Sequence, residues 1–316
     1  MRTGIVLSAL FVLVSSTAFG AAVAHQACGA NAASIQATVD QLRADLGALN
    51  PNVAGSFPSG RREINWDGVP DALSAPNNLP ANFFNVNSPR GVVFSTPGTG
   101  FQVSANAGVA PVRFDNINPT YSTTFTTFSP QRLFTALGSN VVDVNFFVPG
   151  STTPATTSGF GAVFTDVDVA SATSIQYFDS LNVSLGTFPL GSSSSGGLCF
   201  LGVFFNAGER VGRVRITSGN TAVGPNDLPP SQDVVGMDDF IYGEPQAELV
   251  TPTPTVTATP SATATTTATP TTVAPTATPT IIGGGPAPGT VPTLSASMLA
   301  LLAVALAATA VLLIRR

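Results

Sequence analysis

The sequence predicts a mostly β protein. A single β-sandwich or jelly-roll domain carries one N-terminal helix and is followed by a disordered Thr/Pro stalk and a C-terminal transmembrane helix. Roughly ten short segments with a two-residue apolar period follow residue 60, separated by Gly, Pro, Asn or Ser. Phenylalanine, with 21 residues against 3 tyrosines, can fill the space between two sheets. Only residues 31–49 have the apolar spacing of an amphipathic helix.

Residues 1–24 have the pattern of a secretory signal peptide. A basic start precedes the apolar residues 5–14, and Ala22-Val23-Ala24 fits the cleavage pattern, so His25 is the predicted first mature residue. A cut after Gly20 is the alternative cleavage site. The alternative role of the segment is an uncleaved membrane anchor, for which this apolar stretch is short.

Export would bring Cys28 and Cys199 into an oxidising compartment, where two cysteines can pair. A bond between them would close a long loop and stabilise the fold by restricting the unfolded chain. The sequence leaves open whether the two cysteines are bonded or free.

Residues 25–60 are expected to form the helix and a linker, and residues 61–248 the sandwich. The helix has one apolar face, made by Ile35, Val39, Leu42, Leu46 and Leu49. Pro51 and the Gly/Ser/Pro-rich residues after it end the helix.

The strands are recognised by alternation. In residues 141–148 the even-numbered positions are apolar, and in residues 211–217 two arginines alternate with two β-branched residues. Residues 174–178 and 182–188 flank a turn sequence and predict a hairpin. Further strands are expected at 91–95, 100–104, 111–115, 121–128, 160–167, 197–205 and 234–242.

Residues 233–243, with the sequence DVVGMDDFIYG, close the predicted head. They resemble the last strand of lectin-like, jelly-roll domains of exported bacterial proteins, in which Asp-Asp-Phe or Asp-Asn-Phe is followed by Gly. The resemblance implies a sandwich fold for the head and implies little about its function.

Composition excludes several functional classes. The net charge is −5 and the chain has no lysine, so it lacks the basic surface that nucleic-acid binding needs. One histidine and two cysteines leave little for zinc, thiol or histidine-relay chemistry. A non-catalytic protein is therefore expected. A polysaccharide-degrading enzyme that uses two carboxylates is an alternative.

Calcium is the metal that the composition fits, because it prefers oxygen ligands and needs neither His nor Cys. Asp166, Asp168 and Asp238 are the predicted ligands. In regular strands Asp166 and Asp168 share a face, whereas Asp238 and Asp239 point to opposite faces. No D-x-D-x-D-G loop is present, and ordinary surface and turn carboxylates are the alternative interpretation.

The single tryptophan, Trp66, precedes Asp67 and Gly68. Trp66 and Asp67 are predicted glycan contacts, since an indole can stack on a sugar ring while a carboxylate binds its hydroxyls. In the alternative interpretation, Trp66 fills one end of the sandwich and Asp67-Gly68 makes a turn.

Residues 249–290 are predicted to be a disordered stalk. Within them, residues 251–280 hold 15 Thr and 6 Pro and no charged or aromatic residue, so they offer nothing with which to build a core. The prolines favour an extended chain, and the threonines are potential glycan acceptors.

Residues 291–316 form the predicted tail. Val291, Pro292, Thr293 and Leu294 make a short motif, which precedes the uncharged residues 296–314 and a terminal Arg315-Arg316. The uncharged stretch is long enough for a transmembrane helix that leaves the arginines cytoplasmic. The tail resembles the IPTL variety of the PEP-type sorting tails of bacterial surface proteins, with Val in place of Ile.

The resemblance implies processing by an exosortase-like enzyme and leaves open whether the tail is cut or stays as an anchor. Together, these observations predict an exported protein held at the cell membrane or cell surface, with the head outside the cytoplasm. The expected role is non-catalytic, structural or adhesive, in the envelope or extracellular matrix. A lectin-like module that binds a polysaccharide is the first alternative.

Overall fold

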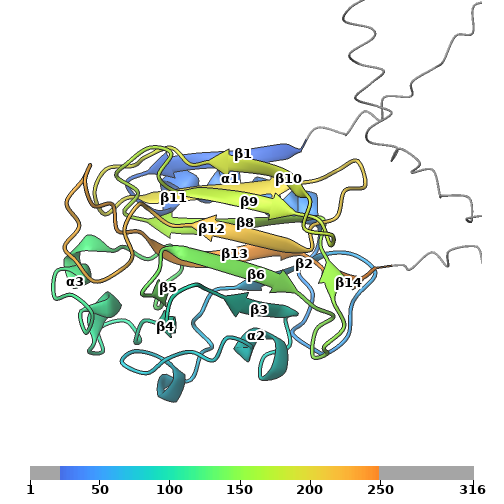
Figure 1. The fold of residues 1–316 in the computed structure, drawn as a ribbon, viewed down its shortest axis with the longest axis horizontal. Coiled ribbons are helices and arrows are strands. Elements are labelled where there is room, and N and C mark those ends of the chain that lie inside the picture. The colour runs from blue at the N-terminus through green and yellow to red at the C-terminus, as the bar shows by residue number, and fades with distance from the viewer. Residues whose placement is uncertain (1–21, 249–316) are drawn as a thin grey trace, which may run out of the picture. The chain divides into compact units, whose positions relative to one another are not determined.

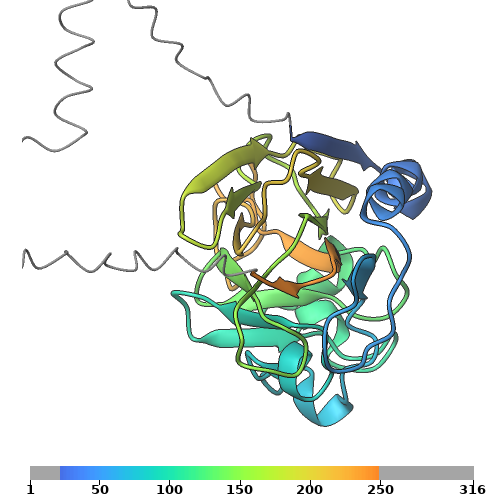
Figure 2. The ribbon, with the colours of Figure 1, turned by 90° about the vertical axis from the view of Figure 1, so that its right-hand side faces the viewer.

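The structure, a computed structural model, describes residues 22–248. Two antiparallel sheets pack together as a sandwich (Figures 1 and 2). The larger sheet has the order β1-β11-β8-β13-β5-β4, with β2 also paired to β13. Its strands are β1 (Val23–Gly29), β2 (Arg61–Ile64), β4 (Gly100–Val103), β5 (Phe134–Leu137), β8 (Gly159–Thr165), β11 (Leu198–Phe204) and β13 (Gly236–Gly243).

The smaller sheet has the order β10-β9-β12-β6-β3. Its strands are β3 (Val92–Ser95), β6 (Val141–Phe146), β9 (Ser174–Phe178), β10 (Ser184–Pro189) and β12 (Arg213–Thr217). The β9–β10 pair is the predicted hairpin. A separate short pair joins β7 (Ala155–Thr156) to β14 (Gln246–Ala247). The short helices are α2 (Phe83–Val86), α3 (Tyr121–Thr124), η1 (Asp71–Leu73) and η2 (Val112–Phe114).

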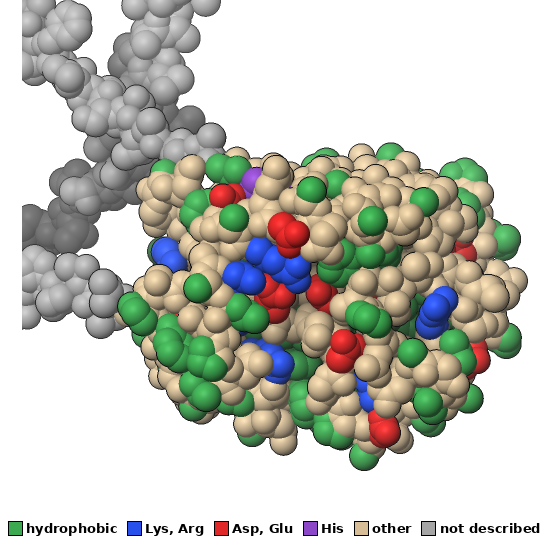
Figure 3. All heavy atoms as spheres, turned by 180° about the vertical axis from the view of Figure 1, so that it is seen from behind, with side chains coloured by type: hydrophobic (Ala, Val, Ile, Leu, Met, Phe, Trp, Pro, Cys, Tyr) green, Lys and Arg blue, Asp and Glu red, His purple; other side chains and the backbone are tan. Residues whose placement is uncertain are grey.

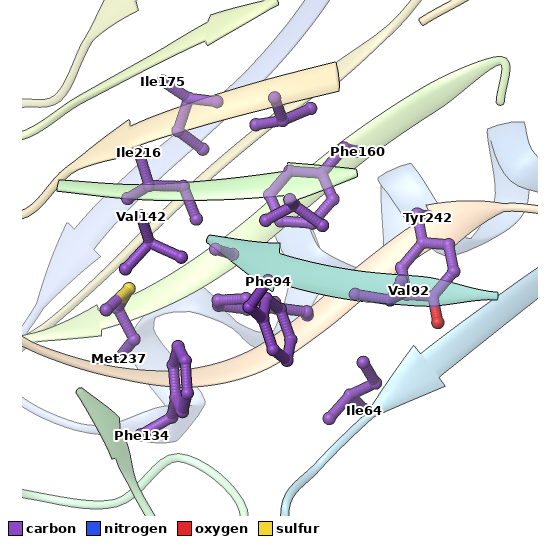
Figure 4. Close-up of a cluster of buried hydrophobic side chains, with 14 of the residues drawn as sticks. Ile64, Val92, Phe94, Phe134, Val142, Phe160, Ile175, Ile216, Met237 and Tyr242 are labelled. Atoms are coloured by element: carbon purple, nitrogen blue, oxygen red, sulfur yellow. The ribbon is translucent and has the colours of Figure 1, made fainter. Parts of the chain in front are cut away.

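Aromatic side chains from both sheets fill the space between them (Figure 4). Phe146 of the smaller sheet lies 5.6 Å from Tyr242 of the larger sheet, measured between ring centroids. Phe94 likewise lies 5.1 Å from Phe134. The alternation predicted for residues 141–148 is confirmed over β6, where Val142, Val144 and Phe146 are buried.

Helix α1 (Ala32–Leu46) covers the outer face of the larger sheet. Asn31 caps its start by accepting a hydrogen bond from the backbone N–H of Ser34. The helix ends three residues before the predicted Leu49, because Gly47 takes a φ of +93°. Leu49 is consequently 57% exposed. The middle strands β8 and β13 are buried along their whole length, between the core on one side and α1 on the other.

The first strand begins before the predicted mature N-terminus. Val23 and Ala24 pair with Phe204 and Val203 in β1 and β11. The last residues of the predicted signal peptide thus lie in the sheet. Whether the chain is cut after Ala24 or after Gly20 stays a prediction.

Two predicted strands are wrong. Residues 111–115 contain η2, and residues 121–128 contain α3. The side-chain oxygen of Asn118 accepts a hydrogen bond from the backbone N–H of Thr120 and so starts a turn rather than a strand. The apolar side chains here form a small cluster of their own, made by Phe114, Tyr121, Phe125, Leu133 and Val234.

The predicted stalk at 249–290, the tail at 291–316 and most of the predicted signal peptide lie outside the described residues. Within residues 22–248, no helix has the length and apolar character that a bilayer span requires.

Candidate functional site

Three aspartates meet where three loops of the larger sheet come together. Oxygens of Asp166, Asp168 and Asp227 lie within 4.8 Å of one another. Asp166 and Asp168 follow β8, and Asp227 lies in the connection from β12 to β13. The pairing of Thr165 with both Gly236 and Leu198 brings the end of β8 beside the starts of β13 and β11. We call these three aspartates the acidic centre.

Asp166 is the buried member of the acidic centre, with none of its surface exposed. Its Oδ1 accepts hydrogen bonds from the backbone N–H of Gly196, at 2.6 Å, and from the hydroxyl of Ser195, at 3.3 Å. Its Oδ2 is buried and has no hydrogen-bond partner within residues 22–248. Burial, with the charges of Asp227 and Asp168, raises the pKa of Asp166 to about 7.

Asp233 lies against the acidic centre as a fourth carboxylate. Its Oδ1 accepts a hydrogen bond from the backbone N–H of Asp168 at 2.9 Å, and its Oδ2 also lacks a partner in the described part of the chain. Burial and the charges of Asp227 and Asp168 raise the pKa of Asp233 to about 6. Burial and Asp227 likewise raise the pKa of Asp168.

These four carboxylates have the chemistry of a site for a hard cation. The charges of Asp168 and Asp227 raise the pKa of both Asp166 and Asp233, and a divalent ion would reverse that effect by favouring the charged forms. Calcium binds carboxylate oxygens and completes its shell with carbonyls and water. The unpartnered Oδ2 of Asp166 has the free lone pairs that a ligand oxygen needs.

Asp238, the third ligand predicted from sequence, does not join the acidic centre. Its carboxylate accepts hydrogen bonds from the backbone N–H of Phe128, at 2.6 Å, and from the Ser129 hydroxyl, at 3.2 Å. Burial and the charge of Asp239 raise the pKa of Asp238 well above its usual range. The sequence missed Asp227 and Asp233, which lie in an irregular loop without a recognisable spacing.

The expected opposite orientation of Asp238 and Asp239 is also wrong. The register of β13 against β8 shifts between Met237 and Phe240, both of which point into the core. The two aspartates between them therefore form a bulge and reach the same hydroxyl, that of Ser129.

Asp239 lines a polar hollow of about 450 Å³ beside α1. Figure 3 shows arginine and acidic side chains gathered around a hollow on this face. Other lining residues are Arg43, Glu63, Asn65, Arg90 and Phe128. We call this hollow the α1 groove.

Trp66 does not reach the surface. It is 1% exposed, stacks on Phe134 at 4.1 Å between ring centroids, and donates its indole N–H to the carbonyl of Asp238 at 2.9 Å. Asp67 lies in the turn that follows and accepts a hydrogen bond from Asn65. The tryptophan is thus a core residue, as in the alternative interpretation, and its ring is unavailable for stacking on a sugar.

Cys28 and Cys199 form a disulfide bond, which links β1 to β11 at directly paired positions. No cysteine in the described residues is free. Disulfides persist in oxidising compartments, so the bond is consistent with a location outside the cytoplasm.

Comparison with known protein families finds no family that matches the chain. A search of curated proteins finds no similar protein.

Proposed function

We propose that this chain is an exported cell-surface protein whose sandwich head binds calcium and has a non-catalytic, structural or adhesive role. The observation that carries the proposal is the acidic centre, in which a fully buried carboxylate oxygen of Asp166 lacks a hydrogen-bond partner among residues 22–248. A bound cation supplies the missing interaction.

Calcium suits this site better than a transition metal. The acidic centre provides carboxylate oxygens and no imidazole or thiolate. Calcium accepts irregular arrangements of oxygen ligands. Sites in extracellular modules bind calcium weakly, with Kd values of about 10⁻⁴–10⁻³ M, which matches a location where the ion is abundant.

The bound ion would act structurally. Asp166 is hydrogen-bonded to the loop before β11 through Gly196, and Asp227 accepts a hydrogen bond from the backbone N–H of Val234 in the loop before β13. One ion held by Asp166, Asp168 and Asp227 therefore fixes three loops at one end of the sandwich.

The proposed location is supported by the disulfide and by the sequence of both ends. The signal peptide directs export, the stalk spaces the head from the membrane, and the tail either anchors the chain or is processed by an exosortase-like enzyme. A lectin-like jelly roll is the proposed class of the sandwich.

A carboxylate-pair enzyme is the less favoured alternative. Glu63 and Asp239 both line the α1 groove, but both oxygens of Glu63 accept hydrogen bonds from Arg43, at 3.0 and 2.9 Å. Arg61 binds the same carboxylate. A carboxylate held by two arginines is a poor nucleophile or base, which supports binding rather than catalysis at this groove.

Isothermal titration of the purified full-length chain with calcium chloride tests the proposal. We expect one ion per chain, and at least tenfold weaker binding in Asp168→Asn and Asp227→Asn. Asp40→Asn removes the same charge from the exposed face of α1 and serves as the matched control. The proposal is wrong if the wild-type chain binds no calcium, or if the three variants bind it alike.

The location is tested separately on intact cells. Mass spectrometry of the mature protein should place its N-terminus at residue 25 or residue 21, and protease added to whole cells should digest the head. A chain recovered from the cytosol with both ends intact would contradict export.

A further inference from the structure

The α1 groove has the chemistry of a second binding site, and it shares no residue with the acidic centre. Its volume of about 450 Å³ lies within the range of small-molecule sites. The elements α1, β2 and β13 position Arg43, Glu63 and Asp239, and connecting loops supply the other side chains discussed here. Helices and strands hold a site more rigidly than loops do.

Both hydrogen-bond donors and acceptors line the groove. Arg43 donates to Glu63, and its guanidinium also lies 3.7 Å from the Oδ2 of Asp239. Arg90 donates to the backbone carbonyl of Glu63 and lies over the ring of Phe84 at 5.2 Å. Within residues 22–248 no carboxylate comes within ion-pair distance of Arg90.

Asp239 is a buried residue of the groove lining, and the bulge in β13 places it there. Its Oδ1 accepts a hydrogen bond from the Ser129 hydroxyl at 2.7 Å, and burial raises its pKa to about 6. Two adjacent buried carboxyls destabilise a strand, because charge is expensive to desolvate. The bulge places both carboxyls beside a cavity despite this cost in stability. Buried charged groups next to a cavity are typical of functional sites.

We infer that the α1 groove binds a neutral oligosaccharide. Two arginines and two carboxylates line it, so neither a polyanion nor a cation finds complementary charge there. Guanidinium donors beside carboxylate acceptors suit the adjacent hydroxyls of a sugar, which both accept and donate hydrogen bonds. Phe128 lines the groove, is half-buried and packs against the hydrophobic residues under α1, so only the exposed part of its ring is offered for stacking.

The test is affinity electrophoresis of the full-length chain in a non-glycosidic detergent. The gels contain dextran, galactomannan, polygalacturonate or no polysaccharide. We expect at least one neutral polysaccharide to retard the chain, both with calcium and with chelator, because the groove is independent of the acidic centre. Asp239→Asn should weaken the retardation at least tenfold, measured as the apparent Kd.

A second variant tests the inference even if Asp239→Asn fails to fold. Asn65 is exposed at the edge of the groove, so Asn65→Trp should fill the groove and abolish retardation without altering the core. Asp115→Asn is the matched control for Asp239→Asn. It makes the same substitution at a side chain that has no hydrogen bond or ion pair within the described residues. The inference is overturned by no retardation in either neutral gel, by retardation in polygalacturonate alone, or by full retardation of Asn65→Trp.

Discussion

Asp166 is the residue whose ionisation couples the acidic centre to stability. Its left-handed backbone, with a φ of +67°, turns the chain out of β8 and directs the carboxylate into the buried end of the sandwich. Asparagine and aspartate tolerate this conformation better than most residues. A substitution by asparagine at 166 therefore keeps the turn and removes only the charge.

Without calcium, stability should fall as the pH rises from about 4 to 7. The pKa of Asp166 is raised to about 7, so the folded state holds a proton that the unfolded state releases near its ordinary pKa of 3.8. The loss from Asp166 is on the order of 3 kcal/mol. Urea unfolding of calcium-depleted protein at pH 4.5 and 7.5 measures it.

The Asp166→Asn variant is the control for this pH dependence. Asp233 and Asp239, with pKa values raised to about 6, contribute in the same direction, so part of the slope should remain in the variant. If wild type and variant lose the same stability between the two pH values, Asp166 does not titrate as described.

At the scale of elements, a buried ion pair joins the ends of β2 and β13. Arg62 donates to both oxygens of Glu244, at distances between 2.8 and 3.0 Å. It also donates to the backbone carbonyls of Val53, Gly55 and Pro89. These bonds use all five donors of the guanidinium, so the pair holds two loops against the sheet.

Glu244→Gln should destabilise the fold by about 3–5 kcal/mol, because it leaves the buried Arg62 charge without a counter-charge. Asp143→Asn is the comparison, since Asp143 pairs with Arg213 and Arg215, whose side chains are 19% and 43% exposed. Breaking these two more exposed pairs should cost less than about 2 kcal/mol in total. Equal losses in the free energy of unfolding for the two variants would contradict the role of burial.

Alternation predicted most of the strands but could not reveal the bulge. The inward positions of β6 and β12 follow directly from a two-residue period. In β13 the same rule places Asp238 and Asp239 on opposite faces. The inserted residue that forms the bulge leaves no trace in composition, so the rule could not detect it. Hence the sequence could group Asp166 with Asp168 but could not show that Asp238 lies apart from them.

Strand β1 was hidden for a different reason. Its first residues, Val23 and Ala24, resemble a cleavage site, and their pairing with Phe204 and Val203 depends on β11, which lies far along the chain. The partners Asp227 and Asp233 come from a loop that the sheet brings to the end of β8. That proximity depends on strand order, which local sequence does not encode.

At the scale of the whole molecule, the disulfide should make a large contribution to stability. Cys28 and Cys199 are 171 residues apart, and chain entropy gives about 5 kcal/mol for a loop of this length. Adding a phosphine reductant should lower the melting temperature by about 10–20 °C.

A Cys28→Ala/Cys199→Ala double variant checks the origin of that effect. It should melt near the temperature of the reduced wild type and should not respond to the reductant. A wild-type melting temperature that reduction leaves unchanged would mean that the bond adds nothing to the folded head.

The central claim is that calcium stabilises the head through Asp166, Asp168 and Asp227. Its most direct test is thermal unfolding of the full-length chain at pH 7.5, with calcium and with chelator. At a calcium concentration of 100 Kd we expect about 2.7 kcal/mol of stabilisation, or a rise of about 5–10 °C in the melting temperature, and at most about half that rise in Asp227→Asn. Identical melting temperatures of the wild-type chain in calcium and in chelator would contradict the claim.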